Sequence, residues 1–192
     1  MNRLTREIFV ERTQDLLLSG SGRDVSLSEV LSACDANKGS LYHFFPSGKE
    51  ELVLAAMNRQ AECALASNRS FIANSKSTSD AVSQLVKSLT AMLEREDCPR
   101  FMPFAATGAI YEGMEQQIGQ VCAQTLESLQ QLYSQSLRNE GVATRLAKSL
   151  GVMIVSSIEG ALLQSRTRGT VLPLKSAGIH LRELIDSHTE SS

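Results

Sequence analysis

The sequence predicts an all-α protein, and three observations support that class. Proline is scarce, with four in 192 residues, and the composition is dominated by residues that favour or tolerate a helix, such as Ala, Leu, Gln and Glu. Apolar side chains recur at helical spacing along most of the chain. No stretch keeps the alternation of a β-strand, and no internal repeat is present. We expect three short N-terminal helices followed by a larger helical bundle.

Local signals mark the second and third helices. Ser26 caps the second helix, and Glu29, three positions later, completes a capping box. Asn37 caps the third helix, which Pro46 ends. Two short helices joined by so tight a turn match a helix-turn-helix. Asp35 is the residue in that turn best suited to the left-handed conformation.

The rest of the chain predicts six further helices. A long helix begins with Ser47 as its cap and Glu50 as the partner of the cap, and it extends to about residue 74. Further helical patterns cover 82–93, 101–110, 118–137, 142–166 and 177–185. The pattern over 142–166 is apolar nearly all round, so we expect both of its sides to be buried, one of them by another subunit.

Composition restricts the compartment and the kinds of site. The four cysteines are far apart and include no CxxC pair, so neither a zinc site nor a disulfide framework is expected. The N-terminus lacks the apolar core of a signal peptide. The most apolar run, 146–163, is interrupted by Lys148 and Glu159, so no membrane span is expected. We therefore expect a reduced, cytoplasmic protein that has no cofactor.

The charge balance limits any nucleic-acid surface to a small area. The formal net charge is −2, and residues 1–60 hold seven Lys and Arg against eight Asp and Glu. A DNA-binding surface at this end must therefore be a local cluster of basic and polar groups, because the module as a whole has almost no net charge.

The third predicted helix carries residues suited to DNA. A recognition helix places its N-terminal residues against the bases in the major groove. Lys38 can pair with a guanine edge or a phosphate, and Gly39 removes bulk where the backbone would approach DNA. Ser40, Tyr42 and His43 can donate hydrogen bonds to phosphates or bases. These five residues form the expected reading face.

Residues around this helix complete the expected DNA contacts. Ser47 and Lys49 bring a helix N-terminus and a cation for backbone phosphate, and Ser26 stands at the start of the second helix. Leu41 and Phe45 are expected to be core residues that hold the third helix against the first two.

Two other classes of function compete with DNA binding. An enzyme needs a nucleophile, a base or a metal set, and the sequence has no HExxH, GxSxG, P-loop or glycine-rich nucleotide fingerprint. We expect no enzyme, and no catalytic or metal-binding residue. A helical adaptor that binds only protein would not need the face between Lys38 and Lys49. That adaptor, or a cytoplasmic enzyme with an unrecognised site, is the alternative function.

The run from Val30 to Phe45, followed by Lys49-Glu50-Glu51-Leu52, resembles the DNA-binding signature of the tetracycline-repressor (TetR) family. The resemblance covers roughly the first 55 residues. Members of that family are all-helical homodimers in which three N-terminal helices bind DNA and the remaining six bind an effector and dimerise. The resemblance thus implies a helix-turn-helix DNA-binding domain over 1–46 and an effector-binding and dimerisation domain over 47–192.

The sequence departs from the usual family pattern at two positions. Asp35 stands where a turn glycine is usual, and Gly48 is an extra residue before the lysine. One branch of the family carries Phe-Pro-x-Gly-Lys-Glu-Glu-Leu, and it also resembles this chain at Cys98-Pro99 and over 159–163. Several repressors of that branch respond to lipophilic or aromatic compounds.

The resemblance implies a repressor that binds a near-palindromic, double-stranded operator and is released by a small, lipophilic or aromatic effector. The homodimer is expected to form through Val142–Arg166 and the C-terminal helix. The effector is expected in a cavity between the central helices, the usual place for a ligand in a helical bundle. The residues expected to line it are Met92, Phe101, Phe104, Tyr111, Cys122, Tyr133 and Met153.

Overall fold

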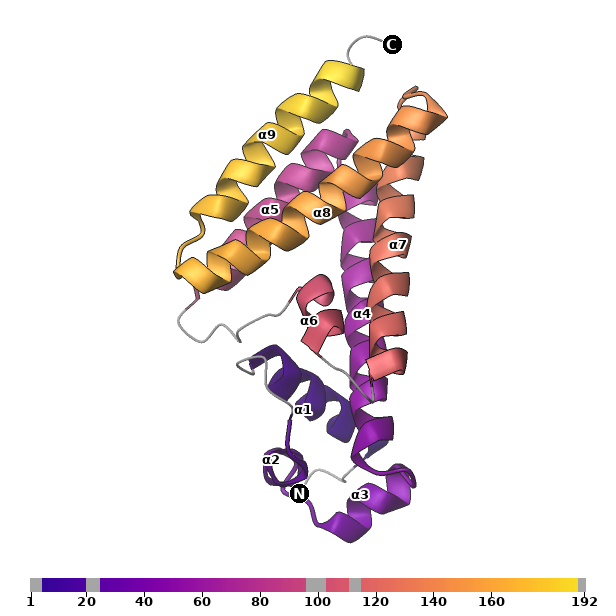
Figure 1. Ribbon diagram of the computed structural model, residues 1–192, viewed down its shortest axis with the longest axis vertical. Helices are drawn as coiled ribbons and strands as arrows, with labels where there is room; N and C mark the ends of the chain where they lie inside the picture. Colours follow the sequence, from indigo (N-terminus) through magenta and orange to yellow (C-terminus); the bar gives the residue numbers. More distant parts are fainter. Residues whose placement is uncertain (1–4, 20–24, 96–102, 111–114, 190–192) are drawn as a thin grey trace.

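The computed structural model describes residues 5–19, 25–95, 103–110 and 115–189, which form nine helices and no strand. The all-α class is therefore confirmed. Three short helices lie at one end of the molecule, and a long fourth helix runs from them into the bundle (Figure 1). The helices are α1 (Arg6–Ser19), α2 (Leu27–Ala33), α3 (Lys38–Phe44), α4 (Lys49–Asn74), α5 (Thr78–Leu93), α6 (Phe104–Ile110), α7 (Glu115–Asn139), α8 (Thr144–Arg168) and α9 (Leu172–Thr189).

Helices α1 to α3 pack with the start of α4 around one small core. Phe9, Val30, Leu41, Phe45 and Leu52 are fully buried in it. The ring of Phe9 lies 6.0 Å, centroid to centroid, from that of Phe45. Leu41 and Phe45 are therefore core residues, as the sequence predicts, and they fix the position of α3.

The predicted caps of α2 and α3 are confirmed. The Ser26 hydroxyl accepts a hydrogen bond from the Glu29 backbone N–H at 3.2 Å, and the Ser26 backbone N–H donates to the Glu29 carboxylate at 2.8 Å. Asn37 Oδ1 accepts from the Ser40 backbone N–H at 2.9 Å. Asp35 takes the left-handed conformation, with φ of 48°, in the turn between the two helices.

The predicted cap of α4 is wrong. The helix begins at Lys49 with Gly48 as its N-cap, and Ser47 instead donates its backbone N–H to the Glu51 carboxylate at 3.1 Å. The reason is the conformation of Gly48, whose φ of 79° is one that glycine adopts without strain. A Cβ at that position would also lie 3.2 Å from the ring of Tyr42.

Helices α5, α7, α8 and α9 share the larger core of the bundle, which α4 joins through partly buried side chains. Helix α8 packs against α7 and α9. Its length and composition alone would suffice to cross a membrane. Within the bundle, however, nine of its residues are buried, among them Ile154 and Leu162. Many of the apolar side chains of α8 therefore pack inside this bundle.

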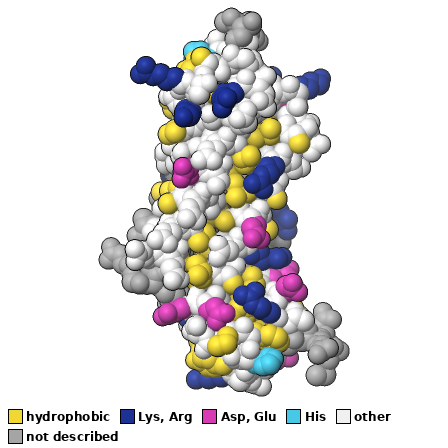
Figure 2. Space-filling model, turned by 90° about the vertical axis from the view of Figure 1, so that its right-hand side faces the viewer, with side chains coloured by type: hydrophobic (Ala, Val, Ile, Leu, Met, Phe, Trp, Pro, Cys, Tyr) yellow, Lys and Arg dark blue, Asp and Glu magenta, His cyan; other side chains and the backbone are white. Residues whose placement is uncertain are grey.

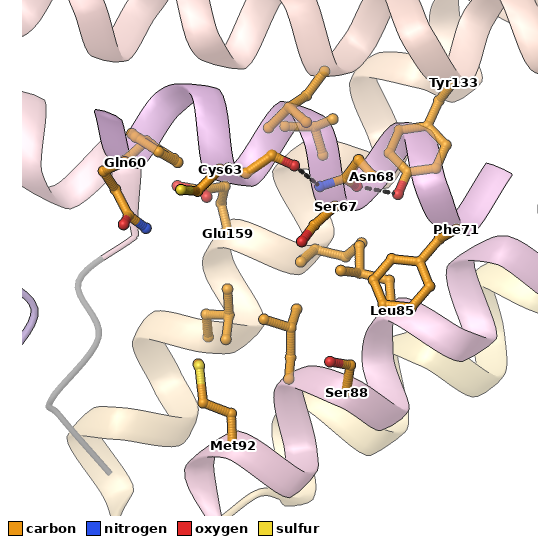
Figure 3. A pocket seen from close by; sticks show the side chains of 17 residues that line it. Gln60, Cys63, Ser67, Asn68, Phe71, Leu85, Ser88, Met92, Tyr133 and Glu159 are labelled. Atoms are coloured by element: carbon orange, nitrogen blue, oxygen red, sulfur yellow. Dashed lines mark hydrogen bonds between the residues drawn. The ribbon is translucent and has the colours of Figure 1, made fainter. Parts of the chain in front are cut away.

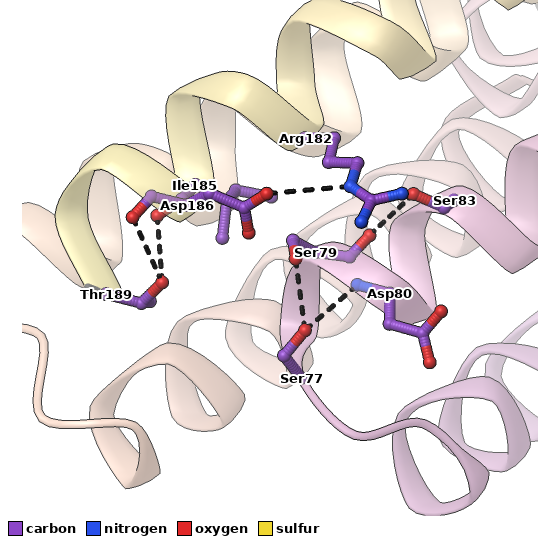
Figure 4. A network of polar contacts seen from close by, with 8 residues as sticks. All are labelled: Ser77, Ser79, Asp80, Ser83, Arg182, Ile185, Asp186 and Thr189. Atoms are coloured by element: carbon purple, nitrogen blue, oxygen red, sulfur yellow. Dashed lines mark hydrogen bonds and ion pairs between the residues drawn. The ribbon is translucent and has the colours of Figure 1, made fainter.

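A polar contact fixes the beginning of α5 against the end of α7. The Thr78 backbone N–H donates to the Glu140 carboxylate at 2.6 Å, which ties α5 to the end of α7. Figure 4 shows the first turns of α5 beside the C-terminal half of α9, where Arg182 pairs with Asp186 at 3.5 Å. Ser77 caps α5 by accepting from the Asp80 N–H at 3.2 Å. The start of α5 is therefore held by local caps and by a long-range bond.

Helices α7 and α8 approach so closely at Gly151 that no side chain fits there. A Cβ at this position would lie 2.5 Å from the carbonyl oxygen of Gln130 on α7. A Cβ at Gly119, on α7, would meet nothing closer than the backbone oxygen of Gly108, at 4.0 Å. These two glycines therefore form a matched pair for testing the packing of α7 on α8.

We expect Gly151→Ala to destabilise the protein by about 1–3 kcal/mol, because α7 and α8 must separate to admit the methyl group. Gly119→Ala is the control: it should be neutral or stabilising by up to about 1 kcal/mol, because alanine is the better helix former. Urea unfolding at one fixed protein concentration measures both. Equal stability of the two variants would contradict the close approach.

Candidate functional site

The exposed side of α3 lies at the end of the molecule, away from the bundle (Figure 1). Lys38, Gly39 and His43 are exposed, and Tyr42 is 50% exposed despite its large ring. An exposed tyrosine on a helix whose other face is fully buried is available to a partner. The geometry thus leaves four of the five predicted reading residues open to a macromolecule.

The serines among the predicted DNA contacts are engaged within the chain. The Ser40 hydroxyl donates to Asn37 Oδ1 at 3.2 Å, and Ser40 is partly buried. The Ser26 hydroxyl donates to the Glu29 carboxylate at 2.6 Å, inside the capping box. Both hydroxyls therefore hold helix ends, and each would need to change partner before it could donate to DNA.

Among the residues that the structure describes, few basic side chains lie near α3. Lys49 is partly buried at the start of α4, and Ser47 is exposed beside it. Arg6, at the start of α1, lies over the ring of Phe45, 4.9 Å from its centroid. The sequence interpretation missed Arg6, because only the tertiary fold brings α1 to the end of α3. On the face in Figure 2, acidic and basic side chains are interspersed at the end where the N-terminal helices lie.

The effector-binding candidate is a cavity of about 230 Å³ between the helices of the bundle. Side chains from five helices line it, and most of them are apolar (Figure 3). This volume exceeds the roughly 150 Å³ of an apolar cavity that accepts benzene. The lining residues are Gln60, Cys63, Ala64, Ser67, Asn68 and Phe71 of α4, Leu85, Ser88, Leu89 and Met92 of α5, Phe104 of α6, Leu129 and Tyr133 of α7, and Val155, Ile158, Glu159 and Leu162 of α8.

The structure places three of the predicted effector residues in this cavity: Met92, Phe104 and Tyr133. Phe101 and Tyr111 lie outside the residues that the structure describes.

Two predicted effector residues do not line the cavity. Cys122 is buried in the same apolar cluster as Phe104 and Ile118, and its Cβ lies 3.1 Å from where a Cβ of residue 108 would stand. Met153 is 49% exposed on the outer face of α8. Helical periodicity shows that a side chain is turned inward, but it cannot say which neighbouring helix or cavity that side chain meets. Burial also raises the pKa of the Cys122 thiol to about 11, so this cysteine stays protonated.

A buried hydrogen bond crosses the cavity wall between α7 and α4. The hydroxyl of Tyr133 donates to Asn68 Oδ1 at 2.5 Å, and Asn68 Nδ2 donates to the backbone oxygen of Ala64 at 2.9 Å. Burial raises the pKa of the Tyr133 phenol above its usual range. Because the oxygen and the nitrogen of the Asn68 amide both have hydrogen-bond partners, these polar groups of the cavity wall need no ligand to complete their bonding.

Glu159 is the one charged residue among the described residues that line the cavity. It accepts a hydrogen bond from the Ala105 backbone N–H at 2.9 Å, at the start of α6. Burial raises its pKa, while the backbone N–H groups of Ala105 and Phe104 oppose that rise by favouring the charged form. The sequence interpretation missed this role. A charge inside an otherwise apolar helical run is the signal that could have found it.

A second polar cluster joins the cavity to the N-terminal module. Gln60, which lines the cavity, accepts a hydrogen bond from Gln14 Nε2 of α1 at 2.5 Å. Arg59 Nε donates to Gln14 Oε1 at 2.9 Å. A single glutamine of α1 is therefore bound to two consecutive residues of α4, one of which faces the cavity.

Because the pKa of Glu159 is raised in the folded protein, the stability of the fold should depend on pH. The folded protein keeps the Glu159 proton to a higher pH than the unfolded chain, whose carboxyl titrates near 4.5. The free energy of unfolding therefore falls as pH rises from about 4.5 through the raised pKa. The Glu159→Gln variant has no carboxyl to titrate at this position, so it does not lose this part of its stability as pH rises. The difference between its melting temperature and that of the native protein should therefore increase between about pH 4.5 and about pH 7. Thermal unfolding over a pH series measures it, and a constant difference would contradict the shift.

Comparison with known proteins agrees with this arrangement. The family model described as "Bacterial regulatory proteins, tetR family" matches residues 17–56. The model described as "Transcriptional regulator LmrA/YxaF-like, C-terminal domain" matches residues 78–180, more than half of the chain.

Individual relatives and solved structures support the same assignment. The HTH-type regulators YxaF and LmrA of Bacillus subtilis are 26% and 24% identical over 148 residues, which are 77% of this chain and 78% and 79% of theirs. A TetR regulator from Chloroflexus aurantiacus superposes with a TM-score of 0.80 at 22% identity, over 94% of this chain and 93% of that one. The chain belongs to the TetR family of bacterial transcriptional regulators and carries a C-terminal domain of the LmrA/YxaF-like type.

Proposed function

We propose that this regulator is a cytoplasmic, ligand-responsive repressor, which binds its operator as a homodimer and is released by a small apolar effector. One observation carries the proposal: α4 begins beside the exposed face of α3 and then lines the cavity of the bundle. The molecule thus combines a helix suited to DNA with a space suited to a ligand, and one rigid element touches both.

Binding to DNA is assigned to the first turn and the exposed side of α3. Lys38, Gly39, Tyr42 and His43 are the contacts that the exposure of the helix supports. In a dimer, two such helices enter successive major grooves about 34–36 Å apart, and the operator is near-palindromic. Because the N-terminal module has almost no net charge, its phosphate contacts must come from a local cluster of basic and polar groups around α3, while the base contacts provide the specificity.

Dimerisation is assigned to α8 and α9. Six large apolar side chains that the structure leaves exposed lie on these two helices: Leu146, Val152, Met153, Leu163, Leu172 and Ile179. A monomer that exposes so many apolar groups on adjacent helices would hide them by association. Residues 142–166 were expected to have a second buried side, and this exposed row is the side that a partner subunit would cover.

Release is assigned to a movement of α4. A ligand in the cavity contacts α4 over residues 60–71, while Leu52 and Ala56 near its start pack into the core of the DNA-binding module. A ligand that favours one position of α4 over another shifts the spacing of the two modules. Gln14 of α1 donates a hydrogen bond to Gln60 and accepts one from Arg59, which attaches the module to the same helix a second time.

An unbiased DNA selection with the purified protein, followed by anisotropy titrations, tests the DNA assignment. We expect Lys38→Ala to weaken binding to the selected site by about 1–3 kcal/mol and to relax the preference at the contacted base. Lys87→Ala removes an exposed lysine of α5 and serves as the control, with little effect on affinity. If the two variants bind equally well, α3 is not the reading helix.

The dimer assignment is tested by placing a charge on each of two exposed positions. Val152, 47% exposed on α8, belongs to the apolar row, whereas Ala66 is exposed on α4. A glutamate at 152 could pair with Lys148, one turn earlier, so the charge is placed at Met153, which is 49% exposed in the same row and has no charged residue three or four positions away. We expect Met153→Glu to sediment as a monomer at micromolar concentration, because a buried unpaired carboxylate opposes association. Ala66→Glu should remain a dimer. A native protein that sediments as a monomer would refute the interface.

A further inference from the structure

We propose that the cavity takes ligands that combine an apolar body with a protonated amine, and that the Glu159 carboxylate selects the positive charge. This inference rests on the proposed function, since it names the chemical class of the effector. It is carried by the contacts of Glu159 and by its position as the one charged group among the described residues that line the cavity.

Glu159 has no cation to balance it within the described part of the chain. Its hydrogen bonds come from backbone N–H groups at the start of α6, and no Lys or Arg forms an ion pair with it there. A carboxylate in such surroundings loses hydration without a full electrostatic compensation. A ligand ammonium would supply that compensation, a neutral ligand would supply only a hydrogen bond, and an anion would be repelled.

The other polar groups at the cavity are less able to anchor a ligand. Asn68 and Tyr133 bond each other, and the second end of the Asn68 amide is held by the backbone of Ala64. The Gln60 oxygen is held by Gln14. The Ser67 and Ser88 hydroxyls and the Cys63 thiol also line the cavity, but they are uncharged. Glu159 is therefore the group that distinguishes a cationic ligand from a neutral one.

The arrangement of the lining gives the ligand an orientation. In Figure 3, Glu159 lies at the same end of the cavity as Gln60 and Cys63, while Phe71 and Tyr133 lie at the opposite end. An amine at Glu159 would direct the apolar body toward the two aromatic rings. The charged end would also lie at Gln60, the residue that is bonded to α1.

Three probes of nearly equal shape test the selection: 1-naphthylmethylamine, 1-naphthalenemethanol and 1-naphthoic acid, which are cationic, neutral and anionic near neutral pH. Binding to the full-length protein is measured by calorimetry at one pH and one salt concentration. We expect the amine to bind at least about tenfold more tightly than the alcohol, a difference of about 1.4 kcal/mol. The acid should bind most weakly.

Two isosteric variants locate the charge that is responsible. Glu159→Gln keeps an oxygen that can accept from the Ala105 N–H, and we expect it to lose about tenfold in amine affinity, or about 1.4 kcal/mol, while alcohol affinity stays within about twofold. Glu62→Gln is the matched control, because Glu62 is an exposed carboxylate of α4 that does not line the cavity. It should leave all three affinities unchanged.

The outcomes separate this inference from the proposed function. Equal affinity for amine and alcohol, or no binding of any probe, overturns the amine selection. An equal loss in both variants overturns the role of Glu159. If Glu159→Gln does not fold, Glu159→Asp, which withdraws the carboxylate by one methylene, replaces it. DNA affinity is measured on the same preparations, so a protein that selects amines but binds no DNA would contradict the proposed function and not the amine selection.

Discussion

The structure depends on one helix that belongs to two cores. The 26 residues of α4 extend over about 39 Å at 1.5 Å per residue. Near its start, Leu52 and Ala56 complete the small core of α1 to α3. One position further along, Val53 and Met57 face a second cluster with α6 and α7. Neither side of α4 can move without disturbing the other, because buried side chains on both are packed against different elements.

Further contacts reinforce the connection that α4 makes. Leu17 of α1 packs against both the small core and the cluster that contains Phe104. Phe104 in turn lines the cavity, and the start of its helix is bonded to Glu159. The DNA-binding module is thus not a separate unit on a linker. Gln60 and Phe104 line the cavity and also belong to the contacts that reach α1, and the coupling proposed above between a ligand and DNA would act through such shared side chains.

The sequence predicts most of the local structure, because local structure is decided by neighbours in the chain. The capping box of Ser26, the Asn37 cap and the left-handed Asp35 all depend on residues within three positions of each other. The wrong prediction of Ser47 as the cap of α4 also concerns neighbouring residues. The positive φ of Gly48 makes Gly48, and not Ser47, the residue at which the helix begins. The sequence contains the Phe-Pro-x-Gly-Lys-Glu-Glu-Leu pattern that includes this glycine, but the pattern alone does not say that the glycine caps the helix.

The sequence by itself determined the helical class, the order of the helices, the two core anchors Leu41 and Phe45, and the family resemblance of the first 55 residues. Only the tertiary structure decided which apolar side chains share a space. Met153 lies on the outer face of α8, and Cys122 packs in the cluster with Ile118 instead of lining the cavity. Glu159 and Gln60 lie together at one end of that cavity. Helical periodicity specifies a direction around one axis, whereas a site between five helices depends on where the other four axes lie.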